Sequence, residues 1–249
     1  MLRMPSASIK QPSSTPSAAS LIRERIKQKG EGYWRVSDFA ELPPAAVTQA
    51  LSRLSREQVL QRVGKGLYYH SRPTTFGPSR PAQSDVLSHR LKMPILPAGL
   101  TAANLLGFTT QNPAQQEYAT PTNAVAPQTI GDKHVRIITR RPESWKGLSI
   151  EDAALLDFLR GRGKTSDLSD SAIQQRLIAL FHEPGRFHRL ADVAQTEPPR
   201  VRAMLGAIGQ EIKADTTILG SLKASLNPLS RFDFGALSGL KHAKEWQAK

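Results

Sequence analysis

The sequence contains no cysteine, which excludes disulfide bonds, thiolate zinc sites and thiol nucleophiles. No run of apolar residues is long enough to span a bilayer, and the first twenty residues lack the apolar middle section of a signal peptide. A transmembrane or secreted protein is therefore not expected. We expect a cytoplasmic protein, because a reducing compartment suits a chain without disulfides.

Acidic residues are few relative to basic ones, with 21 Asp and Glu against 34 Lys and Arg, so the formal net charge is +13. Such an excess makes a polyanionic partner plausible, and nucleic acid fits better than an acidic membrane surface or an acidic protein. Residues 1–80 hold 13 basic and 5 acidic residues, net +8, whereas the remaining 169 hold 21 and 16, net +5. Most of the excess positive charge therefore lies in the first third of the chain, which is where we expect a polyanion to bind.

The length of 249 residues, 39% of them hydrophobic, suits one large domain or two small ones. Residues 1–19 are rich in serine and proline and poor in large apolar side chains, so we expect a disordered arm there. Five prolines between residues 73 and 97 indicate a connector that lies over the surface. We therefore predict one domain at 20–80 and a larger one at 81–249.

The most informative feature of the first domain is a helix that follows the proline pair Pro43-Pro44. Proline ends a preceding short helix and is well tolerated in the first turn of the next one. Val47, Leu51 and Leu54 follow at spacings of four and three, which gives an apolar stripe that must face a core. The opposite face carries side chains that can hydrogen-bond base edges or phosphates in a major groove, namely Thr48, Gln49, Ser52, Arg53 and Arg56.

A hairpin is predicted directly after this helix, with strands at 59–63 and 67–69 joined by Gly64-Lys65-Gly66. Two glycines permit a tight turn and leave Lys65 at its tip, with Arg62 just before it. Basic side chains at such a tip suit contact with a phosphate backbone. Taken alone, Arg53 and Arg56 on an amphipathic helix more often form a solvated face than contact bases. The turn before the helix and the basic hairpin after it favour DNA contact.

The second domain is expected to combine helices with a small antiparallel sheet. Strands are predicted at 115–120, 128–130 and 133–139, the last two forming a hairpin that turns at Gly131-Asp132. Helices are predicted at 84–92, 100–106, 149–159, 170–181, 189–194 and 198–212. The last thirty residues carry apolar anchors among Gly, Ser and Pro and are expected to form a packed tail. The predicted fold class of the whole chain is α+β, mainly helical.

Three sequence phrases carry a family resemblance. LSRL (51–54) with VLQRVGKGLYY (59–69) resembles the winged helix-turn-helix of prokaryotic regulators. Together with ILPAGLTAANLLGFTTQNPAQQEYATP (95–121) and VRIITRR (135–141), it resembles the AbiE antitoxin family, predicted regulators of type IV toxin–antitoxin systems. The resemblance covers roughly residues 20–141.

The resemblance implies an N-terminal winged helix that represses the chain's own promoter and a C-terminal domain that serves toxin neutralisation. It implies a nucleotidyltransferase-like toxin as the second partner, neutralised without a stable complex. On this basis we expect a DNA-binding antitoxin and autorepressor whose DNA-contacting residues are Thr48, Gln49, Ser52, Arg53, Arg56, Arg62 and Lys65.

Two alternatives stay open. The chain could be a winged-helix regulator with a ligand-sensing or dimerisation domain, or a DNA-acting enzyme. The enzyme is disfavoured because the six histidines never pair at metal-ligand spacing, and Gly163-Lys164-Thr165 lacks the earlier glycine of a phosphate loop. We therefore expect no catalytic residues, cofactor, metal or membrane partner. Residues 189–210 also fit a second helix-turn-helix, either structural or DNA-reading, and the sequence leaves the oligomeric state open.

Overall fold

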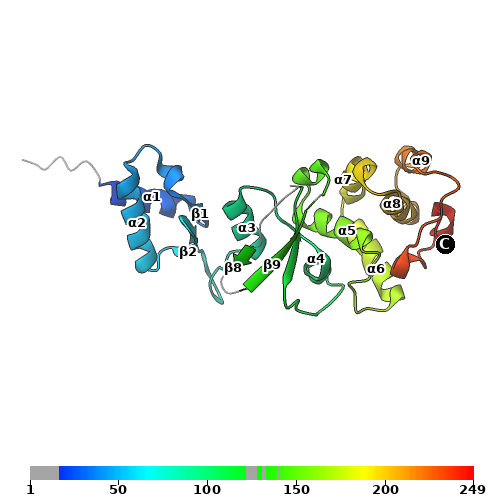
Figure 1. Cartoon of the computed structure of the whole chain (residues 1–249), viewed down its shortest axis with the longest axis horizontal. Coiled ribbons are helices and arrows are strands. Elements are labelled where there is room, and N and C mark those ends of the chain that lie inside the picture. The colour runs from blue at the N-terminus through cyan, green and yellow to red at the C-terminus, as the bar shows by residue number, and fades with distance from the viewer. Residues whose placement is uncertain (1–16, 122–127, 131–132, 140) are drawn as a thin grey trace, which may run out of the picture. The chain divides into compact units, whose positions relative to one another are not determined.

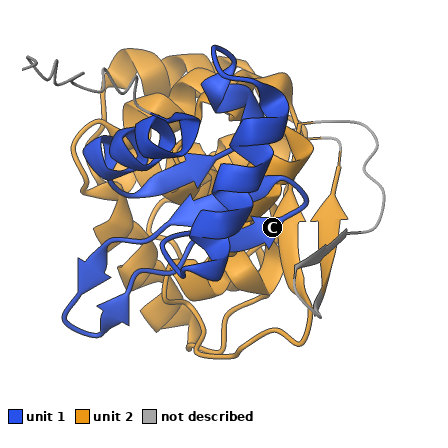
Figure 2. Ribbon diagram, turned by 90° about the vertical axis from the view of Figure 1, so that its left-hand side faces the viewer, with its two compact units in different colours: residues 1–82 blue, residues 83–249 orange. Residues whose placement is uncertain are grey.

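The structure is a computed structural model that describes residues 17–121, 128–130, 133–139 and 141–249 (Figure 1). It divides into two compact units, residues 1–82 and 83–249 (Figure 2), and the division falls close to residue 80. Most of the predicted arm, at 1–16, and the predicted turn at Gly131-Asp132 lie outside the described residues. The α+β, mainly helical class is confirmed.

Unit 1 packs two helices against a small antiparallel sheet with strand order β1-β3-β2. Its elements are α1 (Ala18–Lys29), β1 (Gly32–Trp34), the 3-10 helix η1 (Val36–Phe39), α2 (Pro44–Arg56), β2 (Gln61–Gly64), β3 (Leu67–His70), β4 (Pro73–Thr74) and β5 (Gly77–Pro78). Its apolar core consists of Ile22, Ile26, Trp34, Phe39, Val47, Ala50, Leu51, Leu54, Leu60 and Tyr68.

The first helix begins before residue 20, the predicted start of the first domain. The Ser17 hydroxyl accepts the N–H of Ser20 at 3.2 Å, so Ser17 is the N-cap and α1 starts at Ala18. Helix α1 thus begins two residues before residue 20, where the sequence placed the start of the first domain. Ser17 and Ser20 are three positions apart and both suit an N-cap, and the sequence alone does not distinguish between them.

Unit 2 combines α-helices with a mixed four-stranded sheet, whose strand order is β6-β7-β9-β8. Its strands are β6 (Leu96–Pro97), β7 (Gln116–Ala119), β8 (Gln128–Ile130) and β9 (Lys133–Ile138). Its α-helices are α3 (Gln83–Leu91), α4 (Gly99–Leu105), α5 (Ile150–Arg160), α6 (Asp170–Phe181), α7 (Arg186–Val193), α8 (Pro199–Glu211) and α9 (Thr216–Ala224). Short 3-10 helices are η2 (Glu143–Gly147), η3 (Ala194–Thr196), η4 (Gly235–Leu237) and η5 (Lys244–Trp246).

The prediction of a purely antiparallel sheet is wrong, because β7 and β9 pair in parallel, with Gln116 opposite Val135 and Ala119 opposite Ile138. The hairpin of β8 and β9 is antiparallel, as predicted. Strand β8 precedes β9 along the chain but lies at the edge of the sheet, on the far side of β9 from β7. The hairpin therefore places its second strand, β9, beside β7 and in the same direction. The pairing is non-local, so strand patterns along the sequence carried no sign of it.

Helix α5 lies at the centre of unit 2, in contact with α4, α7 and α8 (Figure 1). The Ser149 hydroxyl caps its N-terminus by accepting the N–H of Asp152 at 3.1 Å. Every residue from Asp152 to Leu159 is buried. The helix therefore forms the core of the unit rather than one of its faces.

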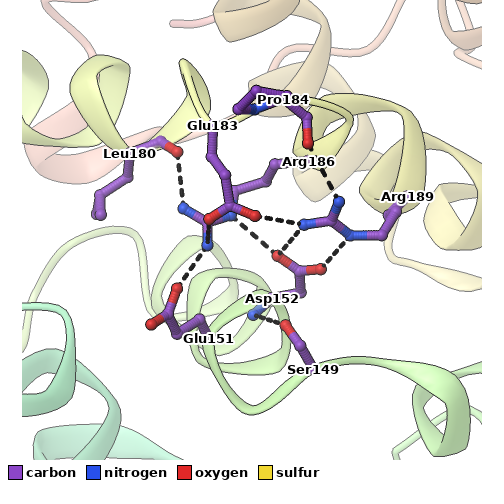
Figure 3. A network of polar contacts seen from close by, with 8 residues as sticks. All are labelled: Ser149, Glu151, Asp152, Leu180, Glu183, Pro184, Arg186 and Arg189. Carbon is purple, nitrogen blue, oxygen red and sulfur yellow. Dashed lines mark hydrogen bonds and ion pairs between the residues drawn. The ribbon is translucent and has the colours of Figure 1, made fainter.

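A buried ion-pair network fastens α5 to α7 (Figure 3). The fully buried Asp152 carboxylate accepts hydrogen bonds from Arg186 Nε at 3.0 Å and from Arg189 Nε at 2.7 Å. Arg186 is only 3% exposed and also pairs with Glu151 at 2.6 Å and with Glu183. Burial acts to raise the pKa of Asp152, but the hydrogen bonds from the two guanidinium groups outweigh it and hold that pKa below its usual value.

The tail is packed, as predicted, and its 3-10 helix η5 contacts α8. Helix α9 was not predicted. Phe234, Leu237 and Trp246 are buried, whereas Leu229 is 89% exposed. A Cβ atom at Gly206 would lie 2.1 Å from the Trp246 ring, so only glycine lets the indole approach α8 this closely. The Trp246 Nε1 also donates to Gln210 Oε1 at 2.6 Å.

Candidate nucleic-acid interface

Helix α2 separates an apolar face from a polar one. Val47, Ala50, Leu51 and Leu54 are buried against α1 and η1. The five residues predicted to contact DNA lie on the opposite face, because their spacing of one, three, one and three positions keeps them within one side of a helix. Four of these side chains are exposed and Ser52 is half-buried; the exposed ones are Thr48, Gln49, Arg53 and Arg56.

Two of the five predicted residues have a partner inside unit 1. The Thr48 hydroxyl donates to the Pro44 carbonyl at 2.8 Å, one turn earlier in α2. Arg53 Nε donates to Glu57 Oε1 at 3.1 Å, and the other oxygen of Glu57 accepts from Arg23 of α1 at 2.5 Å. One carboxylate therefore holds two cations at the end of the helix.

Glu57 and Arg23 were not predicted from the sequence to take part in this surface. The spacing of four between Arg53 and Glu57 was a usable signal, since such pairs are neighbours on a helix surface. Arg23 lies 34 positions earlier than Glu57, and only the fold brings it there. Gln49, Ser52 and Arg56 form no hydrogen bond or ion pair with any part of the chain that the structure describes, so these side chains are available to a ligand.

The hairpin of β2 and β3 places the other two predicted residues. Arg62 lies opposite Tyr68, and Lys65 occupies the turn between Gly64 and Leu67. Both basic side chains are exposed and have no ion-pair partner within the described residues. Gly66 adopts φ 66°, a left-handed conformation that suits glycine in this turn.

The first strand of this hairpin is shorter than predicted, since β2 begins at Gln61 rather than at residue 59. The Leu54 carbonyl accepts the N–H groups of Val59 and Leu60, at 3.0 and 3.2 Å, and so holds these two residues to the end of α2. The hairpin therefore starts directly beside the last turn of α2, which brings Arg62 close to that end of the helix.

A groove flanks each edge of the polar face of α2. One has a volume of about 710 Å³ and runs between the last turn of α2, β2 and the β4–β5 segment, with Ser55, Val59 and Arg62 among its lining residues. The other has a volume of about 500 Å³ and lies between α1 and α2, with Arg23, Gln49 and Arg53 in its wall. The polar face of α2 thus lies between two grooves, and arginine side chains line both of them.

The second helix-turn-helix pattern, at 189–210, does not form a comparable surface. It corresponds to α7, η3 and α8, and in α8 all residues from Ala203 to Gly209 are buried within unit 2. A helix enclosed on so many sides cannot enter a DNA groove. The structural interpretation of this segment is therefore confirmed, and the DNA-reading one is wrong.

Residues 21–176 match the family DUF6088, which is described as a family of unknown function. The match spans more than half of the chain. The chain belongs to the DUF6088 family. This match to DUF6088 includes α2, the β2–β3 hairpin and part of unit 2, but the family description assigns no activity to any of them.

One solved structure, that of the RV2827C protein from Mycobacterium tuberculosis, is similar to this DUF6088 member at 14% sequence identity. The similarity covers 92% of this chain and 90% of that one, with a TM-score of 0.48. No curated protein matches the chain.

Among the described residues, no three His, Asp or Glu side chains are grouped so that they could hold a metal ion. None of the helices in the described ranges combines the length and the apolar character needed to cross a membrane.

Proposed function

We propose that unit 1 binds duplex DNA as a winged helix-turn-helix, with α2 as the recognition helix and the β2–β3 hairpin as the wing. The observation that carries the proposal is the polar face of α2, whose Gln49, Ser52 and Arg56 are exposed or half-buried and unpaired among the described residues. Such a face suits base edges, which present hydrogen-bond donors and acceptors in the major groove.

Each basic residue has a role in this proposal. Arg56, at the end of α2, and Arg62 and Lys65, on the hairpin, contact phosphates on the flanking backbone. Arg53 forms an ion pair with Glu57 and contacts a base or a phosphate only when this ion pair breaks. Phosphate contacts supply most of the affinity and base contacts the specificity.

The proposal extends to the whole chain through its resemblance to AbiE antitoxins. We propose a cytoplasmic antitoxin and autorepressor of a type IV system, in which unit 1 represses its own promoter. Unit 2 serves to neutralise a nucleotidyltransferase-like toxin, without a stable complex. The support for DNA binding comes from residues of unit 1, whereas the antitoxin role rests on the resemblance.

DNA binding is tested with a labelled duplex taken from upstream of the chain's own gene, by fluorescence anisotropy at increasing salt. If about four to six cations neutralise phosphates, the logarithm of the affinity falls against the logarithm of salt with a slope of about −4 to −5. Lys65→Ala should weaken binding to all sequences and reduce the slope by about one. Lys241→Ala removes an exposed cation of unit 2 and is the matched control. A slope near zero for the wild type would refute DNA binding.

Base reading is tested separately with Gln49→Ala. If Gln49 reads a base, the variant loses about 1–3 kcal/mol of affinity for the promoter duplex and little for an unrelated duplex. An equal loss of affinity for both duplexes would show that Gln49 does not contact bases specifically.

The antitoxin role is tested by co-expression with the neighbouring gene. If that gene encodes a nucleotidyltransferase-like toxin, growth should stop when it is expressed alone and recover when this chain is present. A neighbour that is harmless, or toxicity that this chain does not relieve, would refute the antitoxin role and leave the DNA-binding proposal standing.

A further inference from the structure

A second, smaller hairpin follows the proposed wing. It comprises β4 and β5, with Pro73 opposite Pro78 and Thr74 opposite Gly77, in a segment where the sequence predicted only a connector. Its turn is fixed by the Thr74 hydroxyl, which accepts the N–H of Phe76 at 3.2 Å and donates to the Gly77 carbonyl at 2.5 Å. The Phe76 side chain at this turn is 100% exposed.

The base of this hairpin is fastened to the sheet of unit 1. The Glu31 carboxylate accepts hydrogen bonds from the hydroxyls of Tyr69 and Ser79, the latter at 2.7 Å, and pairs with Arg72 Nε at 2.7 Å. The backbone N–H of Arg72 donates to Ser79 Oγ at 3.0 Å and closes the base. The exposed Phe76 therefore lies at the tip of a hairpin whose base is fixed to the sheet of unit 1.

The hairpin forms one wall of the groove of about 710 Å³ described above. Pro73, Thr74 and Gly77 of the hairpin line the groove together with Ser55 of α2, Val59 just after α2, and Arg62 of β2. If α2 lies in a major groove, the strand of phosphates that borders it is the nearest part of the duplex to this cationic hollow. The hairpin then lies across that strand, on the side of the adjoining minor groove.

The charge around the hairpin suits a polyanion. Residues 58–84 contain no acidic residue and four basic ones, Arg62, Lys65, Arg72 and Arg80. Glu31, which pairs with Arg72, is the acidic residue that contacts the base of the hairpin among the described residues.

A protein partner fits this hairpin less well than DNA. Proline has no N–H to donate, so Pro73 and Pro78 hinder any further strand from adding to the hairpin. The neighbours of Phe76 along the chain, Thr75 and Gly77, add no large apolar side chain to the phenyl ring, whereas the core of a protein interface usually gathers several. A lone apolar wedge among cations is typical of proteins that insert a side chain between base steps in the minor groove.

We infer that the β4–β5 hairpin is a second DNA-contacting element, which inserts Phe76 between base steps in the minor groove next to α2 and bends the duplex. The phosphate strand between the two grooves lies in the hollow against Arg62. This inference rests on the proposed DNA binding of unit 1, and its test distinguishes failure of the one from failure of the other.

Phe76→Trp provides a direct reporter on the full-length chain. The native Trp34, Trp145 and Trp246 are at most 2% exposed, so acrylamide should quench mainly the introduced indole. With a saturating promoter duplex, the quenching constant of this indole should fall at least about threefold, because stacking on bases shields it. An indole that stays fully accessible on bound DNA would overturn the inference.

Phe76→Ala tests the consequence for the DNA. A duplex with a donor and an acceptor fluorophore at its two ends should show more resonance energy transfer when bound to the wild type than when unbound, because bending brings the ends together. The Phe76→Ala variant should not produce this increase. The affinity should fall about 5- to 150-fold, the equivalent of one stacked base. Phe76→Trp should restore both. Leu229→Ala removes an equally isolated apolar side chain, 89% exposed in unit 2, and should change neither.

The outcomes separate the two ideas. If the wild type does not bind the promoter duplex or an unrelated one, the proposed function fails and the inference fails with it. If the wild type and Phe76→Ala bind and bend DNA alike, only the inference fails. If the introduced indole is already shielded without DNA, the hairpin packs against protein, and the inference is likewise overturned.

Discussion

Glu57→Gln should strengthen DNA binding. Glu57 is the one carboxylate in contact with the predicted DNA-binding residues of α2 among those the structure describes, and it holds both Arg53 and Arg23. The substitution removes a negative charge from the interface and releases two cations. A gain in affinity is a demanding result, because a damaged or partly unfolded protein would bind less, not more.

The size of the gain follows from the number of cations released. Each additional phosphate contact makes the salt slope steeper by about 0.9, which corresponds to about eightfold tighter binding at about 0.1 M salt. One released arginine therefore gives about eightfold, and both give about sixtyfold, with a slope steeper by about one to two. The loss of stability should stay below about 1 kcal/mol, since the Arg53 and Glu57 side chains are 64% and 39% exposed.

Anisotropy titrations on an unrelated duplex, repeated at several salt concentrations, measure both quantities. Glu143→Gln is the matched control, because Glu143 pairs with Lys146 on the surface of unit 2 and its loss changes the net charge equally. The control should leave the affinity nearly unchanged. Equal effects of the two variants, or weaker binding by Glu57→Gln, would show that α2 does not face the phosphates.

Three changes in unit 2 test the packing of its helices. Asp152→Asn removes the carboxylate shared by Arg186 and Arg189 and should lower the free energy of unfolding in urea by about 1–3 kcal/mol, since Arg186 keeps its ion pairs with Glu151 and Glu183. Replacing Asp152 with Leu and Arg186 with Met together should cost less. The pKa of Asp152 in the folded protein lies below its usual value of 3.8. The wild type should therefore keep this stabilisation above pH 3.8 and lose it as the pH falls through the pKa of the folded state. Asp152→Asn should show no such loss. Gly206→Ala should displace the Trp246 ring, lower the Tm and shift tryptophan emission to the red.

The parts of the fold that were predictable are those that local chemistry determines. Helix α2 begins at Pro44, as expected from proline in a first turn, and its apolar stripe at Val47, Leu51 and Leu54 is buried. Helix α6 occupies the predicted residues 170–181, since the Ser169 hydroxyl caps it by accepting the N–H of Ala172. The polar face of α2 follows from the same periodicity.

The remaining features depend on contacts between distant residues. The pairing of Arg23 with Glu57 and the parallel pairing of β7 with β9 join segments that no local pattern relates. The β4–β5 hairpin has strands of only two residues, too short for any alternation to be visible, and its prolines resemble those of a linker. The role of Phe76 could therefore not be inferred before its exposure was known.

The position of Trp246 determines the order in which the two units can fold during synthesis. Unit 1 is complete once residue 82 has been made, whereas the core of unit 2 lacks the indole beside Gly206 until residue 246 is in place. Domains generally fold as units while the chain is still being translated, at about 5–20 residues per second. Unit 1 is thus expected to be folded about 8 to 33 seconds before the core of unit 2 can close.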